Sequence, residues 1–304
     1  MNKQETVSVI IPLYNHEKYI KDAIESVLNQ TFPVHEIIII DDGSTDGSAD
    51  IIKNYYRNNE KIKYFYQENS GAHNAINRGI KISEGNFVAI LNSDDVYKKT
   101  KIERCIEILH KYNKDVVFGG VDFIDSEGDL ILNGIPVDWY LKGKEFLNRS
   151  ELFLLSMLNE NIIVSTSNMF FRKDIKYNYF YPLRYCHDLA FIQLCENYNN
   201  YYYDKENIHL SYRYHNKNTI KEDYKKVLVE LAGVTAISLV DANMCLLEES
   251  TQKAVFLREF LDRKNISSLV IFLIAIYCKI NDKNKFYSYI SEVENKNLLC
   301  SFIK

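Results

Sequence analysis

Short apolar runs alternate with segments of helical periodicity through the first hundred residues. The apolar runs occupy residues 7–11, 37–40, 62–66 and 87–91. Their length and polar flanks predict buried β-strands. Between them, apolar residues recur at three- and four-residue spacing, which predicts helices. These helical segments occupy residues 19–28, 51–56 and 72–80. Strand and helix in repeated alternation predict an α/β protein with a parallel sheet built from βαβ units.

Acidic or amide side chains follow three of these strands at the point where each one ends. They are Asp41, Asp42, Asn69, Asp94 and Asp95. The carboxyl ends of parallel strands meet at one edge, where open α/β sheets bind their ligands. The adjacent carboxylates Asp94 and Asp95 can bind a divalent metal that neutralises a diphosphate. The plainer alternative is a polar turn that ends the strand.

The ordered motifs in this region resemble those of family 2 glycosyltransferases. They are Val-Ile-Ile-Pro-Leu-Tyr-Asn at 9–15, Asp-Asp-Gly-Ser-Thr-Asp-Gly-Ser at 41–48, Glu-Asn-Ser-Gly at 68–71 and Asn-Ser-Asp-Asp at 92–95. The resemblance is close over roughly residues 7–96 and looser to about residue 218. One departure is His73, where the family more often has a small or polar residue. The resemblance implies an inverting enzyme of the GT-A fold, with a mainly parallel central sheet flanked by helices.

The resemblance also implies roles on the side of the sugar donor. Asp95 is expected to ligate Mn²⁺ or Mg²⁺, Asp94 to contact the ribose or sugar, and Asp42 to contact the uracil of a UDP-sugar. For Asp42 the alternative is an Asx turn, for which Asp41 or Asp46 is better placed. The other residues expected to bind the donor are Pro12, Tyr14, Asn15, Glu17, Asn69, Asn77 and Arg78.

Several of these donor-side residues have plainer interpretations. Glu17 can contact a ribose or supply a negative charge to a helix N-terminus. Arg78 can pair with a diphosphate or remain solvated, as most surface charges do. Asn69 precedes Ser70 and Gly71, which open a helix whose first amides can face the donor phosphate or sugar.

An inverting sugar transfer requires a general base that deprotonates the acceptor hydroxyl. The resemblance implies that this base follows the metal motif, as an acid that opens a helix. Asp188 fits because it precedes an apolar helical stripe, although His187 stands where the family more often has Glu. The alternatives are that Asp188 is an ordinary helix cap, or that His187 is the base.

Two later stretches resemble the acceptor half of the family. Residues 165–172 are predicted to be a strand that leads into a loop, with Ser167 and Asn168 as candidates for acceptor or phosphate contacts. Further on, Arg213 can neutralise a phosphate, and His215 can approach the diphosphate or the metal. An ordinary loop histidine is an equal alternative for His215.

Trp139 and Tyr140 are expected in a loop after Pro136. An aromatic ring there can stack on an acceptor sugar, although lone aromatic residues more often pack in a core.

Length and composition narrow the class of protein. A chain of 304 residues suits a GT-A domain at 1–220 with a helical C-terminal extension at 221–304. A net charge of −4 favours no nucleic-acid partner. Residues 1–6 lack the pattern of a signal peptide, and the six cysteines show no C-x-x-C pair. These features predict a cytoplasmic protein with reduced thiols.

The C-terminal extension is apolar and mildly basic. Its longest apolar stretch, 269–278, is too short to span a bilayer. Residues 253–304 carry nine Lys or Arg and five Asp or Glu, which suits peripheral contact with an anionic membrane surface. The favoured alternative is a helical cap or a dimer contact, because apolar helical stripes are usually core. The pattern does not specify an oligomeric state.

The resemblance implies an inverting, metal-dependent transferase. Such an enzyme is expected to move a sugar from a nucleotide-diphosphate donor, a UDP-sugar, to a glycan or lipid-linked acceptor in cell-surface polysaccharide synthesis. A nicotinamide-dependent enzyme or a nucleotidyltransferase would need a glycine-rich loop after the first strand, and none is present. The remaining alternative is a non-catalytic module that binds a sugar nucleotide or a glycan.

Overall fold

The structure is a computed structural model that describes residues 5–150, 157, 160–176, 178–196, 200–216, 218, 223–241, 251–296 and 299. It separates into two compact units, each built from several segments. Unit 1 comprises Met1–Val137, Ile163–Tyr179 and Asn199–His215, and unit 2 comprises Asp138–Ile162, Phe180–Tyr198 and Asn216–Lys304. The division into domains at residue 220 stays a prediction.

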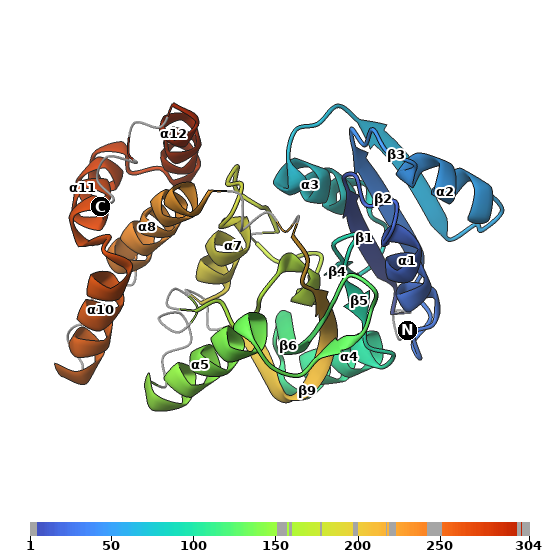
Figure 1. The fold of residues 1–304 in the computed structure, drawn as a ribbon, viewed down its shortest axis with the longest axis horizontal. Helices are drawn as coiled ribbons and strands as arrows, with labels where there is room; N and C mark the ends of the chain where they lie inside the picture. The colour runs from blue at the N-terminus through green and yellow to red at the C-terminus, as the bar shows by residue number, and fades with distance from the viewer. Residues whose placement is uncertain are drawn as a thin grey trace. The chain divides into compact units, whose positions relative to one another are not determined.

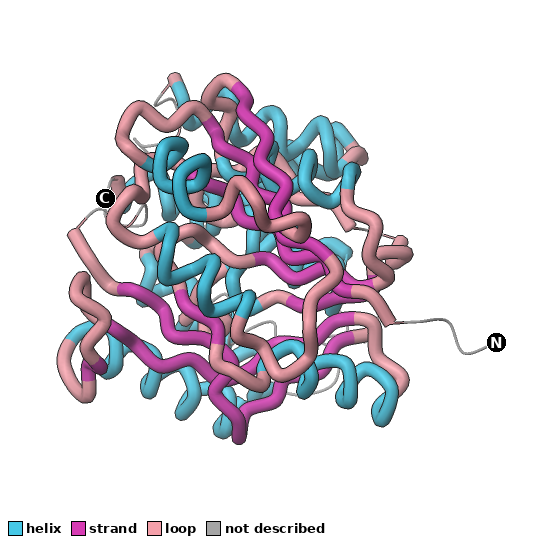
Figure 2. Tube along the Cα trace, turned by 90° about the vertical axis from the view of Figure 1, so that its right-hand side faces the viewer, coloured by secondary structure: helices cyan, strands magenta, loops and turns pink. Residues whose placement is uncertain are grey.

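A mixed sheet of nine strands forms the centre of unit 1 within the described residues (Figure 1, and magenta in Figure 2). The strands are β1 (Val7–Leu13), β2 (Glu36–Asp42), β3 (Ile62–Gln67), β4 (Phe87–Ile90), β5 (Val96–Tyr97), β6 (Val116–Ile124), β7 (Leu130–Ile131), β8 (Phe170–Arg172) and β9 (Tyr201–Arg213). Their order is β3-β2-β1-β4-β8-β6-β9-β5, and β7 pairs with β6.

The N-terminal half of this sheet is parallel, as the sequence predicts. Strand β1 lies between β2 and β4, and β2 also pairs with β3, all in parallel. Every residue of β1 and β2 is buried, which is typical of parallel strands covered on both faces. The other half mixes directions, because β8 is antiparallel to both β4 and β6 while β9 is parallel to β6.

Unit 1 has the three predicted helices and one more between β5 and β6. They are α1 (Ile20–Leu28), α2 (Ser48–Tyr55), α3 (Ala72–Ile82) and the additional α4 (Lys101–Tyr112). Helix α3 packs on β1 and β2. Its Gly79 allows this close approach, because a Cβ there would lie 2.4 Å from Ile10 Cγ2. Helix α2 begins after Gly47, and the preceding Asp46 Oδ1 accepts a hydrogen bond from Ser48 N at 3.0 Å.

Two segments differ from their predicted structure. In 165–172 the order is reversed, since a 3-10 turn at Thr166–Asn168 precedes strand β8. The turn forms because Ser165 Oγ accepts a hydrogen bond from Ser167 N. The predicted loop around Trp139 is wrong, because that residue lies in helix α5 (Ile135–Ser150). Pro136 is tolerated there because it occupies the first helical turn.

Helices make up most of the described part of unit 2. Besides α5 they are α7 (His187–Glu196), α8 (Tyr224–Asp241), α10 (Thr251–Lys264), α11 (Ser267–Ile280) and α12 (Lys283–Asn295). Helix α8 contacts α7, α11 and α12. The apolar stretch 269–278 lies in α11, which buries Leu269, Val270, Leu273 and Tyr277. Part of its apolar surface is therefore core, as the favoured interpretation of this stretch predicts.

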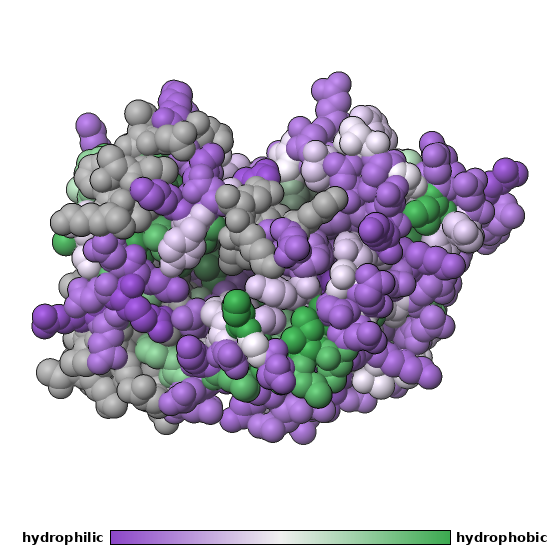
Figure 3. Space-filling view, viewed as in Figure 1, coloured by the Kyte–Doolittle hydropathy of each residue, from purple (hydrophilic) through white to green (hydrophobic). Residues whose placement is uncertain are grey.

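None of the helices described is long and apolar enough to cross a bilayer. The face drawn in Figure 3 is mainly hydrophilic, with apolar side chains in small groups.

Candidate functional site

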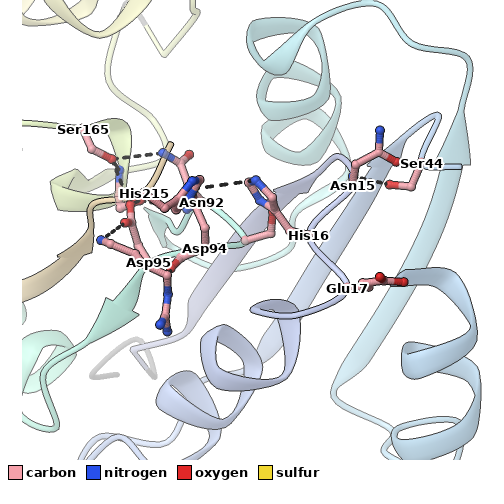
Figure 4. Close-up of polar contacts among 12 residues, drawn as sticks. Asn15, His16, Glu17, Ser44, Asn92, Asp94, Asp95, Ser165 and His215 are labelled. Atoms are coloured by element: carbon pink, nitrogen blue, oxygen red, sulfur yellow. Dashed lines mark hydrogen bonds and ion pairs between the residues drawn. The ribbon is translucent and has the colours of Figure 1, made fainter. Parts of the chain in front are cut away.

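His16, Asp94 and His215 come together just beyond the carboxyl ends of β1, β4 and β9. Their ligand atoms all lie within 4.8 Å of one another (Figure 4). His215 Nε2 lies 3.0 Å from Asp94 Oδ2, and His16 Nε2 lies 3.8 Å from the same oxygen. In the described part of the chain, no other group of three His, Cys, Asp or Glu side chains offers ligand atoms this close. We call these three residues the His-Asp-His cluster.

Neighbouring side chains orient both imidazole rings of the cluster. His16 Nδ1 lies 2.8 Å from Ser93 Oγ. The tautomer with its proton on Nδ1 donates to this hydroxyl and leaves the Nε2 lone pair toward Asp94. The ring of His215 stacks on Tyr19, with centroids 5.2 Å apart. A hydrogen bond at the second ring nitrogen, such as that between His16 and Ser93, holds the ring of a metal-binding histidine in place.

The two adjacent carboxylates have opposite pKa shifts. Burial opposes ionisation of Asp94, but the charge of His16 and the hydrogen bond from His215 outweigh it and hold the pKa of Asp94 below its usual value. For Asp95, burial and the charge of Asp94 together raise the pKa above its usual value. Asp94 is therefore the carboxylate that the surrounding charges keep ionised.

Asp95 faces a ring of hydrogen-bond donors rather than the histidines. Its Oδ2 accepts from Ser167 Oγ at 2.5 Å and from Ser165 Oγ at 3.2 Å, and its Oδ1 accepts from Arg213 N at 3.0 Å. The sequence assigns the metal to Asp95 and a sugar contact to Asp94. The geometry instead groups Asp94 with the histidines, and the role of Asp95 as a ligand stays a prediction.

Ser167 and Asn168 are fully buried and support the structure behind Asp95. Ser167 Oγ also accepts a hydrogen bond from Asn92 N at 2.8 Å. The Asn168 side chain forms two hydrogen bonds with the backbone of Gly119. Its Oδ1 accepts from Gly119 N at 2.9 Å, and its Nδ2 donates to the Gly119 carbonyl at 2.7 Å. This placement favours a supporting role for both residues over the predicted contacts with an acceptor or a phosphate.

The Arg213 guanidinium is also buried, and it donates hydrogen bonds to other residues of the protein. Its Nε donates to the Asp94 carbonyl at 2.8 Å, and its Nη2 donates to Asp22 Oδ2 at 2.9 Å. Its Nη1 donates to the Asp125 carbonyl at 3.1 Å. These contacts join the loops after β4 and β6 to α1. They favour a positioning role for Arg213 over the predicted phosphate contact.

Asp42 and Asn15 connect the loops that follow the first three strands. Asp42 accepts from the backbone N of Ser70 at 2.9 Å and of Gly71 at 2.8 Å. Asn15 has a φ of 53°, and its Oδ1 accepts from Thr45 N at 2.7 Å. Asp41 Oδ1 accepts from Ser44 N at 2.8 Å, and the Asx turn before α2 belongs to Asp46, whose Oδ1 accepts from Ser48 N at 3.0 Å. Asp46 is one of the two residues that the sequence argument preferred over Asp42 for this turn.

Two of the predicted donor-binding residues make contacts that stabilise the fold. Glu17 Oε2 accepts from Gly47 N at 2.7 Å, at the start of α2. This is the helix N-terminal charge that the sequence left as one alternative. Arg78 Nη1 donates to the Tyr66 carbonyl at 2.8 Å.

The remaining predicted donor-binding residues differ in exposure. Pro12 is buried in β1, Asn77 is half-buried in α3, and Asn69 is exposed before that helix. The Tyr14 side chain is 48% exposed beyond the end of β1.

In unit 2, Asp188 lies in the first turn of α7. Ala190 N donates to the Cys186 carbonyl at 3.0 Å, so Cys186 provides the first helical acceptor and Asp188 is not the cap. Asp188 Oδ1 accepts from Leu189 N and Oδ2 from Asn161 Nδ2, each at 2.7 Å. Burial raises the pKa of Asp188 to about 6. A buried carboxyl with this pKa is suited to act as a base near neutral pH.

His187, the competing base, is a weaker candidate. Burial lowers its pKa to about 4, and its Nδ1 lies 3.1 Å from the Leu183 carbonyl. An imidazole with such a low pKa binds a proton less readily at neutral pH than Asp188 does.

His16 is the member of the His-Asp-His cluster that the sequence analysis missed. It directly follows the motif at 9–15, so it stands at the carboxyl end of the first strand. This position could have identified His16 as a candidate site residue, because the other candidate residues also follow strands. Its significance depends on β1 and β4 being neighbours, which the sequence pattern does not reveal.

Comparisons with known proteins agree with this fold. The model of the family described as "Glycosyl transferase family 2" matches residues 8–178. The putative teichuronic acid biosynthesis glycosyltransferase TuaG of Bacillus subtilis is 39% identical over 147 residues, which are 48% of this chain and 56% of TuaG. Glycosyltransferase GlyG of Streptococcus pneumoniae is 34% identical over 144 residues, which are 47% of this chain and 46% of GlyG. The chain thus spans about half the length of these two relatives.

A solved structure is similar over almost the whole chain. S. aureus TarS 1–349 in complex with UDP-GlcNAc has a TM-score of 0.57 and 20% sequence identity, over 96% of this chain and 92% of that one. At this identity the likeness concerns the fold alone, and it confirms the predicted GT-A architecture. Because the family model covers more than half of the 304 residues, this chain belongs to glycosyl transferase family 2.

Proposed function

We propose that this chain transfers a sugar, with inversion, from a UDP-sugar to a glycan or lipid-linked acceptor in the synthesis of a surface polysaccharide. Family membership supports a sugar transfer. The name of TuaG refers to teichuronic acid biosynthesis, and TarS structures are described with UDP-GlcNAc and with UDP. The observation that carries the proposal is the His-Asp-His cluster at the ligand-binding edge of the sheet.

The residues of the cluster fit a divalent metal. Two imidazole nitrogens and one carboxylate oxygen converge within 4.8 Å of one another. Of the two predicted ions, Mn²⁺ accepts imidazole ligands more readily than Mg²⁺, whose ligands are almost always oxygens. A bound metal neutralises the negative charge that develops on a departing nucleoside diphosphate. Asp95 and Arg213 hold the backbone that carries Asp94.

The loops after β1 and β2 are proposed to hold the nucleotide. Asp42 lies at the end of β2, and two backbone N–H groups fix its carboxylate. Its Oδ1 also accepts a hydrogen bond from Gln67 Nε2 at 2.7 Å, whereas its Oδ2 accepts from Gly71 N. The second lone pair of Oδ2 can therefore accept a hydrogen bond from the uracil imide. Tyr14 offers an exposed ring beyond the neighbouring strand, where it can contact the base or ribose.

Asp188 is proposed as the general base. It takes the proton of the acceptor hydroxyl as that oxygen attacks the anomeric carbon. The new oxygen–carbon bond forms on the face opposite the nucleotide, and the bond between the anomeric carbon and the diphosphate oxygen breaks. The nucleoside diphosphate leaves with the bonding electrons, so the configuration at the anomeric carbon inverts. The pKa of about 6 keeps Asp188 mostly ionised, and thus able to accept a proton, above that pH.

Thermal unfolding with nucleotides tests the donor and metal parts of the proposal together. The midpoint is measured with UDP, GDP and dTDP, each with and without Mn²⁺, for the wild type, Asp94→Asn and the exposed-site control Asp129→Asn. A ligand at 100 times its Kd stabilises the native state by about 2.7 kcal/mol. We expect a Mn²⁺-dependent shift with UDP in the wild type and the control, and none in Asp94→Asn. The proposal is contradicted if no nucleotide raises the melting temperature of the wild type. It is also contradicted if the shift is the same without Mn²⁺ and in Asp94→Asn.

Turnover separates an enzyme from a non-catalytic binding module on the same fold. Release of UDP from UDP-sugars is measured with the wild type and Asp188→Asn in the presence of acceptor glycans. The proposal predicts release by the wild type and its loss in Asp188→Asn while UDP still binds. Binding of UDP without any release by the wild type favours the binding module.

A further inference from the structure

A buried glutamate on α8 holds the backbone that leads into α7. Glu230 is fully buried. Its Oε1 accepts a hydrogen bond from Arg184 N at 2.7 Å, and its Oε2 accepts from both Tyr185 N and Cys186 N at 2.8 Å. One side chain thus binds three successive backbone amides that lie 44 to 46 positions earlier in the chain. All of these residues lie in unit 2.

These three amides directly precede the helix that carries Asp188. The Cys186 carbonyl accepts the first hydrogen bond of α7, from Ala190 N, and Asp188 follows two residues later. The Glu230 carboxylate therefore lies at the N-terminal end of α7. Backbone N–H groups are unsatisfied there, and the helix dipole favours negative charge. Fixing three consecutive residues before the helix also fixes where its first turn begins.

The arrangement is more elaborate than helix capping requires. A Ser, Thr, Asp or Asn at the cap position satisfies such amides locally, whereas here a carboxylate is buried on another helix. Burial and the hydrogen bond with Glu294 raise the pKa of Glu230 above its usual value. Glu294 is itself buried and lies on α12. Helices α12 and α8 thus jointly support the backbone in front of Asp188.

We propose that Glu230 is a positioning residue, which orients the general base Asp188 by clamping the backbone of Arg184, Tyr185 and Cys186. The inference rests on the proposed function of Asp188. It assigns a catalytic purpose to the predicted C-terminal extension. A merely structural carboxylate would affect stability, whereas a positioning one affects turnover after the donor has bound.

The test compares Glu230→Ala and Glu230→Gln with Thr235→Val. Thr235 is a matched control, because it is buried on the same helix and its hydroxyl bonds only within that helix, to the Leu231 carbonyl at 2.7 Å. Steady-state transfer, the UDP and Mn²⁺ thermal shift, and amide hydrogen exchange at 184–186 are measured for each folded variant. Glu230→Gln keeps the shape of the side chain, and its single amide oxygen can accept two of the three bonds.

We expect Glu230→Ala to lower kcat by roughly 10- to 100-fold, with KM for the donor nearly unchanged. Exchange of the three amides should accelerate, and Glu230→Gln should lie between Ala and wild type. Thr235→Val should match the wild type in kcat and exchange. In an Asp188→Asn background, Glu230→Ala should lower the residual turnover no further, because both substitutions remove the same contribution.

Three outcomes overturn the inference: unchanged kcat and exchange in Glu230→Ala, equal losses in Glu230→Ala and Thr235→Val, or a full additional loss in the Asp188→Asn background. Failure of the proposed function looks different. In that case the wild type transfers no sugar, while exchange at 184–186 still decides whether Glu230 clamps this backbone.

Discussion

His215 Nε2 lies 3.0 Å from Asp94 Oδ2, although 121 positions separate the two residues in the chain. One follows β9 and the other follows β4, two strands that are not neighbours in the sheet. His16, which follows β1, completes the cluster from a third strand. Three chain segments therefore form one candidate metal site at the ligand-binding edge of the sheet.

Substitution of either histidine should weaken metal binding. We expect His16→Ala and His215→Ala each to reduce Mn²⁺ affinity, measured by calorimetric titration with UDP present, by about 100-fold or more. Loss of a residue that hydrogen-bonds to a metal ligand typically lowers metal affinity 10- to 100-fold, so loss of the ligand itself should cost at least as much. The exposed His110 supplies the control His110→Ala, which should bind as the wild type does. If His16→Ala binds Mn²⁺ as tightly as the wild type does, His16 is not a ligand of the site.

Asp188→Asn should abolish most of the turnover. General-base catalysis contributes typically 10²- to 10⁴-fold, so we expect a fall of about that size in kcat. Because burial raises the pKa of Asp188 to about 6, wild-type kcat should rise with pH up to about 6 and then level off. A pH–rate profile from pH 4.5 to 8 measures this. A wild-type profile that is flat in this range would argue against Asp188 as the base.

The same substitution should stabilise the fold at alkaline pH. Folding raises the pKa of Asp188 from 3.8 to about 6, so its protonated form contributes stability below about pH 4 that is lost as the pH rises through about 6. The shift of about two units corresponds to about 3 kcal/mol. Asn carries no charge, so Asp188→Asn should melt several degrees above the wild type at pH 8. The difference should shrink toward pH 5, and a lower melting temperature at pH 8 would contradict this account.

Glu17→Gln should distinguish between the two interpretations of Glu17. In the structure its carboxylate bonds Gly47 N at the start of α2. A charge at a helix N-terminus contributes about 0.3–1 kcal/mol, so stability should fall by about that amount while UDP affinity stays within twofold. Chemical denaturation and UDP titration are the two measurements. A large loss of UDP affinity at unchanged stability would instead restore the predicted ribose contact.

Gly79→Ala should strain the packing of α3 on β1. The added Cβ would lie 2.4 Å from Ile10 Cγ2, and Ile10 is fully buried. Overpacking a core of this kind costs about 1–3 kcal/mol, which outweighs the better helix propensity of Ala. Lys81→Ala, at an exposed position of the same helix, is the control and should change little. If Gly79→Ala unfolds at the same denaturant concentration as the wild type, the added Cβ causes no strain and the described close approach of α3 to β1 is wrong.

Local chemistry explains why much of the fold was predictable. The first four strands and the three helices between them follow from apolar runs and helical periodicity. The predicted burial is wrong only for β3, which lies at the edge of the sheet and is partly exposed. The Asx turn at Asp46 follows from the short reach of an Asp side chain to its own backbone. The position of Asp188 in a first helical turn follows from the apolar stripe behind it. Each of these depends on residues within a few positions of one another.

Only the tertiary structure determines the contacts between segments that are distant in the chain. His16 joins Asp94 because β1 and β4 are neighbours, and Arg213 is engaged because the loops after β4 and β6 lie beside it. Glu230 reaches the amides before α7 only because α8 packs on that helix. Strand order and helix packing arise from the burial of the whole chain. A pattern read along the sequence therefore shows which residues end a strand, and the folded chain decides which of them meet.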